Sequence, residues 1–333
     1  MTARLPLLAG SALAARAALR ALRAQDLDGK TALVTGGSRG LGFAIASELA
    51  DAGARVAICA RGEEALGRAR AQLEARGAEV LASRCDVARR DEVERWVGEA
   101  TDRFGRVDVL VNNAGVISVG PLLAQRPEDF ALAMDIHFWG IVNPVYAVLP
   151  QMLERGAGTI ANVTSIGGKV SVPMLSSYTP SKYAAVGLSQ GLHAELSRYG
   201  IHVLTVVPGL MRTGSYLSAL FKGDQELLYS LFSPVASSPL NTISAGRAAR
   251  RIVRGIRHRE TEVTLTLHAK LATRAAGVAP GLVTEALALL NKVLPDGADP
   301  RAIRGDHVDS RVDESLLTAL GRRAARATNQ PPD

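Results

Sequence analysis

The sequence predicts a doubly wound α/β fold, in which a parallel sheet of about seven strands is flanked by helices within one domain. Two observations predict this fold. Short apolar segments with strand character alternate with longer segments of helical periodicity, so each strand is followed by a crossover long enough for a helix. The turns after these strands are rich in Gly, Asn and Pro, and they fall at the carboxyl edge, where such sheets bind ligands.

The composition fits a globular protein. The 333 residues are 47% hydrophobic and 21% charged, which suits one large α/β domain with extensions or two small domains. Cys59 and Cys85 fall at the ends of predicted strands without disulfide or metal-ligand spacing, which favours buried free thiols and no metal site. The net charge of +7 permits an anionic ligand or membrane surface, whereas the scattered arginines disfavour nucleic acid as a partner.

An amphipathic extension is predicted for residues 1–27. On a helix, Arg16, Arg20 and Arg23 share one face and several leucines lie off it. The apolar run at residues 5–15 is too short to span a bilayer, which takes about 20 residues. The cofactor pattern downstream favours a cytoplasmic protein over an exported one. Packing on protein and peripheral contact at the inner face of a membrane remain the two alternatives for this extension.

The main domain, predicted at residues 28–266, opens with a strand at 31–35, a glycine-rich turn and a helix at 43–52. Such a turn lets backbone N–H groups and the helix N-terminus face a pyrophosphate, because glycine allows close approach. The spacing is G-x-x-x-G-x-G rather than the common G-x-G-x-x-G. The predicted cofactor-binding residues of this turn are Thr35, Gly36, Ser38, Arg39, Gly40, Leu41 and Gly42.

The second unit predicts a strand at 54–60, a helix at 63–76 and a strand at 79–84. The position after the second strand of a dinucleotide site faces the adenosine ribose, where an acid would repel a 2′-phosphate. Arg61 occupies this position, and Arg39 lies in the first turn. Two guanidinium groups favour NADP(H) over NAD(H), the alternative being that either arginine is simply solvent-exposed.

The later strands end at further distinctive stretches. After a helix at 90–104, the predicted strands and the residues at their ends are 107–111 with Asn112-Asn113-Ala114-Gly115, 158–163 with Ser165, and 201–207 with Pro208-Gly209. The carboxyl ends of parallel strands meet at one edge of a sheet, so we expect these residues to lie close together.

Tyr178 and Lys182 stand four residues apart, so on a helix they share a face. Ser176 or Ser177 is a suitable N-cap, with Pro180 in the first turn. A phenol ordinarily titrates near pH 10, and a neighbouring ammonium favours the phenolate. The pair can therefore move a proton nearer neutrality, although by itself the spacing is also typical of a solvated helix face.

Taken together, these motifs resemble the short-chain dehydrogenase/reductase family over residues 28–266. The matching residues occur in the family's order and spacing: Thr35-Gly36-x-x-x-Gly40-x-Gly42, Asp86, Asn112-Asn113-Ala114-Gly115, Ser165, Tyr178-x-x-x-Lys182 and Pro208-Gly209. The resemblance implies a Rossmann-type sheet and an NAD(P)-dependent enzyme that interconverts a secondary alcohol and a ketone.

The resemblance also implies roles for individual residues. Tyr178 would pass a proton to the substrate carbonyl oxygen, Ser165 would hydrogen-bond that oxygen, and Lys182 would bind the nicotinamide ribose and lower the pKa of Tyr178. The cofactor would further be lined by Asp86 and Val87 at the adenine, by Asn113, Ala114 and Gly115 along its path, and by Pro208, Gly209 and Thr213 at the carboxamide end.

One position departs from the family pattern, because His137 stands where an Asn normally completes the proton path with Lys182. An imidazole can also donate and accept a hydrogen bond, so the path is compatible with His137. If it titrates near its ordinary pKa of about 6.5, a charge beside Lys182 would impair the relay at acid pH. The alternative is a packed histidine without a catalytic role.

The chain beyond the shared motifs is expected to cover the substrate and extend the fold. An apolar helix-like segment at 216–232 implies a hydrophobic substrate such as a steroid, retinoid or lipid, or else ordinary packing of a lid. A helix at 244–257 and a strand at 262–267 follow. In the C-terminal extension, 267–333, an apolar stripe of Val283, Leu287, Leu290 and Leu294 suits docking on the domain, a homo-oligomer contact or a membrane interface. A short helix is predicted at 314–325, with a disordered tip.

A second class of function remains open. A cofactor-binding regulatory or scaffold protein would keep this fold without the reaction. The intact Ser165, Tyr178 and Lys182 favour the enzyme, and the His137 departure favours its rival.

Overall fold

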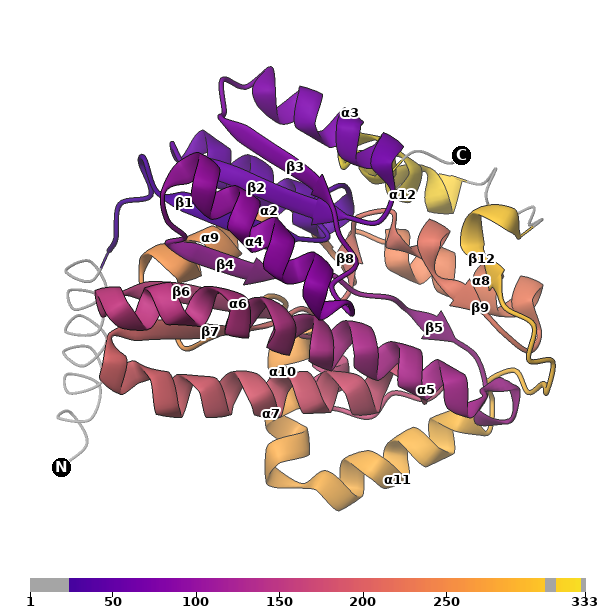
Figure 1. Cartoon of the computed structure of the whole chain (residues 1–333). Helices are drawn as coiled ribbons and strands as arrows, with labels where there is room; N and C mark the ends of the chain where they lie inside the picture. The colour runs from indigo at the N-terminus through magenta and orange to yellow at the C-terminus, as the bar shows by residue number, and fades with distance from the viewer. Residues whose placement is uncertain (1–23, 309–315, 331–333) are drawn as a thin grey trace, which may run out of the picture.

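A computed structural model describes residues 24–308 and 316–330. Its centre is a seven-stranded parallel sheet with the order β11-β7-β6-β4-β1-β2-β3, which confirms the predicted doubly wound Rossmann-type architecture. Figure 1 shows the sheet with helices on both faces. Its strands are β1 (Thr31–Thr35), β2 (Arg55–Ala60), β3 (Val80–Arg84), β4 (Val109–Asn112), β6 (Gly158–Val163), β7 (Ile201–Val207) and β11 (Glu262–Thr264).

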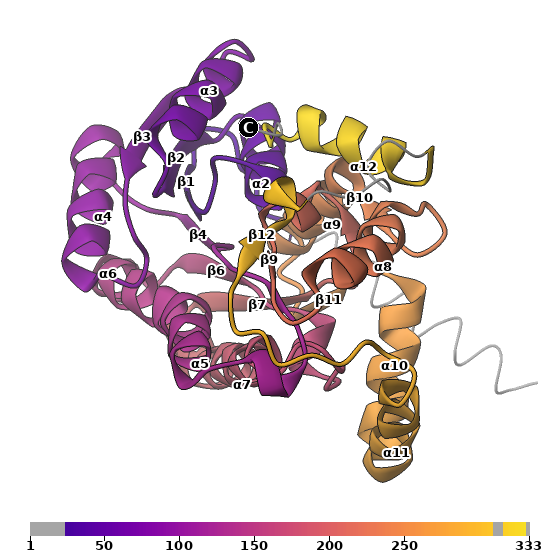
Figure 2. The same cartoon turned by 90° about the vertical axis from the view of Figure 1, so that its right-hand side faces the viewer.

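Two aliphatic cores hold the helices on the sheet. Figure 2 shows these helices around the sheet. One core joins the sheet to α2 (Gly40–Asp51), α3 (Glu63–Glu74) and α9 (Ala245–Arg257). The other joins it to α4 (Arg90–Phe104), α6 (Gly140–Arg155) and α7 (Tyr178–Leu196). The central strands β1 and β7 are buried on both faces, as expected for a parallel sheet covered by crossover helices. Cys59 and Cys85 are buried and free, as predicted.

The segment at 216–232 is not one helix, contrary to the prediction. It contains a short 3₁₀ turn (Ser215–Ser218), the strand β9 (Leu220–Phe221) and the start of α8 (Gln225–Ser237). Gly223 has a φ of +79°, and the Asp224 side chain then accepts a hydrogen bond from the Leu227 N–H to start the helix. The β9 strand pairs with β5 (Ser118–Val119) and β12 (Ile303–Arg304). Tertiary pairing therefore overrides the apolar helical pattern.

The C-terminal extension folds back onto the domain. Helices α10 (Leu267–Val278) and α11 (Pro280–Asn291) project from the sheet in Figure 1 and Figure 2, and the chain then returns through β12. Helix α12 (Leu316–Ala327) packs on α8, and Gly321 allows this contact because a Cβ there would lie 2.2 Å from Ser237 Oγ. Thr328, Asn329 and Gln330 are each about 5% exposed or less, so the disorder predicted for the tip Asn-Gln-Pro-Pro-Asp is wrong for Asn329 and Gln330.

One predicted strand is shorter than expected, and one predicted segment lies mostly outside the described residues. The strand predicted at 262–267 ends at Thr264, since Thr266 accepts a hydrogen bond from the Ala269 N–H and caps α10. Most of the predicted N-terminal extension, residues 1–23, lies outside the described residues.

Candidate active site

The ends of β1 and β4 are joined by a polar cluster. Both the Asn113 and Ala114 N–H groups donate to Thr35 Oγ1, at 2.9 and 3.1 Å. The Asn113 side-chain amide donates to the carbonyl oxygens of Thr35 and Gly36. The glycine-rich turn and the Asn-Ala-Gly turn, which are 78 residues apart in the chain, therefore form one rigid edge.

The glycine-rich turn has the shape of a dinucleotide cradle. Gly36 and Gly40 have φ of +63° and +60°, which L side chains rarely adopt. A Cβ on Gly42 would lie 2.1 Å from the Gly36 carbonyl oxygen, so only glycine permits this packing. The turn leads directly into α2, whose first amides have no intrahelical partners. A turn of this shape fits a pyrophosphate, and in this structure its first helical amide, the Gly40 N–H, donates to the Thr328 carbonyl oxygen at 2.8 Å.

The residues predicted to meet the adenine follow β3. The Asp86 carboxylate accepts a hydrogen bond from the Ala88 N–H, and the Val87 carbonyl accepts one from the Asn143 side chain on α6. Between the glycine-rich turn and α3 lies a cavity of about 220 Å³, which Arg39 lines. Arg61, the other arginine predicted to meet a 2′-phosphate, is not among the residues that line this cavity, whereas Arg68 is.

Ser165, Tyr178 and Lys182 come together at the ends of β6 and α7. Tyr178 is the first residue of α7, and its hydroxyl is hydrogen-bonded to Ser165. Lys182 lies one turn along, with Nζ 5.6 Å from the Tyr178 ring centroid and 3.3 Å from the Val163 carbonyl oxygen. The loop after Ser165 approaches α7 so closely that a Cβ on Gly168 would lie 2.4 Å from the Lys182 carbonyl oxygen. The predicted triad is thus assembled by close backbone packing.

The capping of α7 differs from the prediction. Ser177 occupies the N-cap position, but its side chain makes no capping hydrogen bond and its Oγ donates to Gln125 instead. Pro180 lies in the first turn, as expected.

Burial dominates the electrostatics of the triad. It lowers the pKa of Lys182 to about 7, because the charged ammonium is desolvated. Burial also raises the pKa of Tyr178, and the hydrogen bond from Ser165 only partly offsets this. The expected lowering of the Tyr178 pKa by Lys182 is therefore not seen in this structure, since Lys182 is itself only partly charged near neutrality.

His137 lies in a π-helical turn (Asp135–Trp139) between α5 (Pro127–Met134) and α6. The Val116 N–H donates to its Nε2 at 3.1 Å, so the ring proton is on Nδ1, which donates to Ser181 Oγ at 2.8 Å. Ser181 in turn donates to the Tyr178 carbonyl oxygen. Both ring nitrogens thus bind protein groups that hold the Asn-Ala-Gly turn against α7, and neither contacts Lys182.

The pKa of His137 lies well below its ordinary value, first because of burial and second because of the nearby Lys182 charge. The titration near pH 6.5 considered from the sequence is therefore wrong. Gly115 belongs to the same contact, since a Cβ there would lie 3.2 Å from His137 Nε2.

The carboxamide end of the predicted site is also ordered. The Pro208 carbonyl oxygen accepts a hydrogen bond from the Ile166 N–H at 2.7 Å, which ties it to the loop of Ser165. A Cβ on Gly209 would lie 2.4 Å from Thr266 Oγ1. Thr213 is buried, and its Oγ1 accepts from the Ser215 N–H. The structure thus brings Pro208 next to the Ser165 loop.

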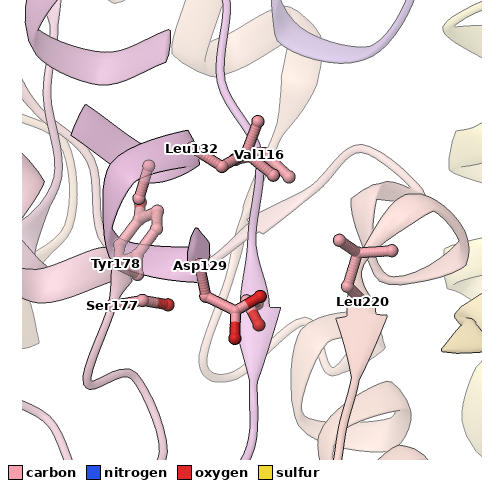
Figure 3. A pocket seen from close by; sticks show the side chains of 8 residues that line it. Val116, Asp129, Leu132, Ser177, Tyr178 and Leu220 are labelled. Atoms are coloured by element: carbon pink, nitrogen blue, oxygen red, sulfur yellow. The ribbon is translucent and has the colours of Figure 1, made fainter. Parts of the chain in front are cut away.

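A small cavity lies beside Tyr178 (Figure 3). Tyr178 and Leu220 lie on opposite sides of it, with Val116 and Asp129 between them. The Asp129 carboxylate is paired with the buried Lys222 at 2.6 Å. The residues that line the cavity are Val116, Ser118, Asp129, Leu132, Ala133, Ser177, Tyr178 and Leu220.

Several of these residues were not identified from the sequence. Ser181 is an unspecified position of the Tyr178-x-x-x-Lys182 motif, and the Asp129–Lys222 pair lies in segments without a motif. Thr328, Asn329 and Gln330 reach the glycine-rich turn from the C-terminal part of the chain. The available signal was weak: Ser181 stands three residues after Tyr178, which places it near the face that Tyr178 and Lys182 share, but a lone serine there carries no pattern of its own.

Comparison with known proteins agrees with this geometry. Residues 30–219 match the family described as short chain dehydrogenase. The chain is 38% identical over 183 residues to the 3-oxoacyl-[acyl-carrier-protein] reductase FabG of Staphylococcus epidermidis, which covers 55% of this chain and 75% of FabG.

Solved structures give the same result. A short chain dehydrogenase/reductase from Burkholderia phymatum in complex with NAD superposes with a TM-score of 0.71 at 27% identity, over 78% of this chain and 96% of that one. A gluconate 5-dehydrogenase from Burkholderia cenocepacia in complex with NADP and tartrate gives a TM-score of 0.65 at 27% identity, over 75% of this chain and 99% of that one. The chain belongs to the short-chain dehydrogenase/reductase family of NAD(P)-dependent oxidoreductases.

Proposed function

We propose that this protein interconverts a hydrophobic ketone and its secondary alcohol with NADP(H), using Ser165, Tyr178 and Lys182. The observation that carries the proposal is the contact of Tyr178 with Ser165 and Lys182 at the end of the sheet that bears the glycine cradle. The nicotinamide supplies the hydride when it is bound. The Tyr178 hydroxyl gives its proton to the carbonyl oxygen, which Ser165 orients by a second hydrogen bond.

Lys182 has two tasks in this proposal. In its protonated form it donates to the ribose hydroxyls beside the nicotinamide, and only in that form does its charge favour the phenolate that Tyr178 becomes after proton transfer. A Lys182 pKa of about 7 lets the same group take up and release a proton near neutrality. His137 acts as a positioning residue, because its bonds to Val116 and Ser181 fix the two backbones that flank the site.

The NADP(H) preference rests on positive charge at the adenosine ribose. Arg39 lines the cavity between the glycine-rich turn and α3, and Arg61 follows β2 directly. A 2′-phosphate gains charge-assisted hydrogen bonds from guanidinium groups, whereas a 2′-hydroxyl gains less. The NADP complex of the gluconate 5-dehydrogenase and the NAD complex of the Burkholderia phymatum protein show that relatives of this fold accept either cofactor.

The hydrophobic substrate is supported by the cavity beside Tyr178. Val116, Leu132, Ala133 and Leu220 give it an apolar wall, and the Asp129 charge is neutralised by Lys222. FabG, a relative, is a 3-oxoacyl reductase by name, which supports a ketone as the reacting group.

The direct test is NADPH oxidation by the purified protein across a panel of ketones that range from short and polar to steroid-like and long-chain acyl. The proposal predicts turnover that rises with the apolar area of the ketone and is faster with NADPH than with NADH. No oxidation with any ketone, combined with tight NADPH binding, would favour the rival regulatory or scaffold function.

We also propose that the protein is a cytoplasmic homo-oligomer assembled through α5 and α6. The exposed apolar residues of this continuous helix recur every seven positions, as Leu132, Trp139, Tyr146 and Leu153. Helix α7 adds the exposed Tyr183 beside them. The helix Pro127–Arg155 is apolar and long enough to cross a membrane, but 44% of its most apolar stretch is buried inside the fold. This apolar stripe of Leu132, Trp139, Tyr146 and Leu153 is best suited to contact with a second copy of the chain.

Peripheral membrane contact is proposed for the arm formed by α10 and α11. Its exposed apolar residues include Leu267, Leu271, Val278, Leu282, Leu289 and Val293. Lys270, Arg274 and Lys292 accompany them, against the single acid Glu285. Of the stripe predicted from the sequence, Leu290 is 48% exposed and the other three residues are half-buried. An apolar surface with excess positive charge suits an anionic bilayer.

A further inference from the structure

Residues Thr328–Gln330, which we call the C-terminal strap, lie between the glycine-rich turn and the loop after β7. The Gly40 N–H, the first amide of α2, donates to the Thr328 carbonyl oxygen at 2.8 Å. On the other side, Thr328 Oγ1 donates to the Thr213 carbonyl oxygen at 3.0 Å, and the Gln330 side-chain amide donates to the Gly214 carbonyl oxygen at 2.7 Å. The strap is buried and joins the two loops.

The end of α12 directs the strap into this position, and in Figure 2 it lies beside α2. Asn329 has a φ of +53°, a left-handed conformation that Asn tolerates better than most L residues, and the Gln330 N–H donates to the Ala325 carbonyl oxygen to close the helix. The Asn329 side-chain amide then donates to the Ser38 and Ala65 carbonyl oxygens, at 2.7 and 2.8 Å. Because α12 is held separately by α8, only the residues after the helix have to move for the strap to leave.

The strap takes up a hydrogen-bond donor that a pyrophosphate needs. The N-terminus of a helix binds phosphate oxygens through its first free amides and its dipole. At the Gly40 N–H, the Thr328 carbonyl oxygen occupies the place of such an oxygen. The Gln330 side chain fills the space beside it, since a Cβ on Gly40 would lie 3.5 Å from Gln330 Oε1 and 3.9 Å from Thr213 Cβ. The strap therefore lies in the path of a dinucleotide that runs from the glycine-rich turn to Thr213.

We propose that the C-terminal strap is an autoinhibitory element, which competes with the pyrophosphate of the dinucleotide for the N-terminus of α2. This inference rests on the proposed function and adds a form of regulation to it. The side chains of the strap are uncharged, whereas a pyrophosphate carries the negative charge that a helix N-terminus favours, so the cofactor is able to displace the strap. The apparent affinity of the protein for the cofactor is reduced by the fraction of molecules in which the strap is closed.

Calorimetric titration of the full-length protein with NADPH tests this competition. Asn329→Pro fixes φ near −65° and so excludes the left-handed turn by which the strap enters. If the strap is open in at most about one molecule in ten, Asn329→Pro should bind NADPH at least about tenfold more tightly than the wild type. The gain should be the same for NADH, because the two cofactors share the pyrophosphate. Asn291→Ala, at the exposed end of α11, should bind both as the wild type does.

Hydrogen exchange of the wild type gives a second measurement that needs neither a variant nor turnover. Without cofactor, the Gly40 and Gln330 amides should exchange slowly, because both are hydrogen-bonded. Saturating NADPH should speed exchange in the strap at least about tenfold, while exchange in the glycine-rich turn stays slow. This measurement decides the question even if Asn329→Pro does not fold.

Two results would overturn the inference and leave dinucleotide binding intact. One is equal or weaker NADPH binding by a folded Asn329→Pro protein. The other is unchanged or slower exchange in the strap when NADPH binds, which would mean that the strap supports the cofactor site instead of competing for it. If neither the wild type nor Asn329→Pro binds a dinucleotide, the proposed function is wrong, and the autoinhibitory role is wrong with it.

Discussion

Lys182 is a buried amine whose charged form is disfavoured by its surroundings. Its pKa is lowered to about 7 by burial, against 10.5 for the free side chain. The unfolded chain therefore binds more protons than the folded chain between pH 7 and pH 10.5, so folding stability rises with pH across this window. The penalty for burying the ammonium is complete below pH 7.

The free-energy cost of burying the Lys182 ammonium predicts that Lys182→Met stabilises the protein while abolishing most activity. Methionine keeps an apolar stem of similar length and removes the buried charge. The free energy of unfolding should rise by at least about 1 kcal/mol at pH 6, and the gain should shrink toward pH 10. Urea unfolding at several pH values measures this free energy of unfolding. An equal gain at pH 6 and pH 10 would show that the buried charge of Lys182 is not the cause.

His137 gives a second prediction at the residue scale. His137→Asn retains an acceptor and a donor for Val116 and Ser181, so its kcat should stay within about threefold of the wild type. His137→Leu leaves the Val116 N–H without a partner in a buried place, which costs about 1–3 kcal/mol and should lower kcat/KM at least tenfold. Because the pKa of His137 lies well below 6.5, the acid limb of the pH profile should be the same for the wild type and His137→Asn.

Equal kinetics for the Asn and Leu variants would refute the positioning role of His137. A loss of the acid limb in His137→Asn would instead restore the proton relay considered from the sequence.

At the scale of elements, the turn between β1 and α2 depends on glycine. A Cβ on Gly42 would lie 2.1 Å from the Gly36 carbonyl oxygen and 2.4 Å from Asn113 Nδ2. We predict that Gly42→Ala destabilises the fold by more than about 2 kcal/mol and weakens NADPH binding. Gly67→Ala is the matched control, since nothing lies within 4 Å of a Cβ in the middle of α3. It should stabilise the protein by about 0.5–1 kcal/mol, as alanine favours helix.

The stripe on α5 and α6 gives a prediction about assembly. Tyr146 is 65% exposed near the middle of the stripe, so Tyr146→Glu should place charges in the proposed contact and shift the protein to monomers in sedimentation velocity. Tyr199→Glu, at an exposed site beyond the end of α7, should leave the oligomer unchanged. Identical sedimentation of Tyr146→Glu and the wild type would exclude this face as the interface.

At the scale of the whole molecule, the sheet and its ligand edge could be predicted, because periodicity and glycine spacing are local properties of the chain. The order of motifs along the sequence was enough to bring Ser165, Tyr178 and the Asn-Ala-Gly turn to one edge. The glycine-rich turn was predicted as a cradle for the same reason.

The remaining features depend on partners distant in sequence. The Asn329-Gln330 stretch has a composition typical of a disordered tip, and its burial is determined by Ser38 and Ala65, more than 260 residues away. Leu220 and Phe221 fit a helix pattern but pair with β5 and β12. The pKa of Tyr178 is raised by burial and only partly lowered by the hydrogen bond with Ser165, and burial cannot be inferred from the spacing of Tyr178 and Lys182.

The arm of α10 and α11 gives the last prediction about a surface. Replacing the exposed Leu282 and Leu289 by Glu should reduce co-sedimentation with phosphatidylserine-containing vesicles at least about fivefold, since it removes apolar area and adds repulsion. Ketone reduction in solution should not change, because both residues lie outside the site. Removal of residues 1–25 in a parallel sample measures the share of the N-terminal segment. Unchanged co-sedimentation of the double variant would refute membrane contact by this arm.

The central claim is that Tyr178 transfers the proton, and Tyr178→Phe tests it most directly. The variant removes one hydroxyl and keeps the ring that packs beside His137. NADPH oxidation with the best ketone of the panel should fall at least about 10³-fold, while NADPH binding measured by fluorescence stays within about threefold, and Tyr199→Phe should match the wild type in both. Full ketone reduction by a folded Tyr178→Phe protein would contradict the account.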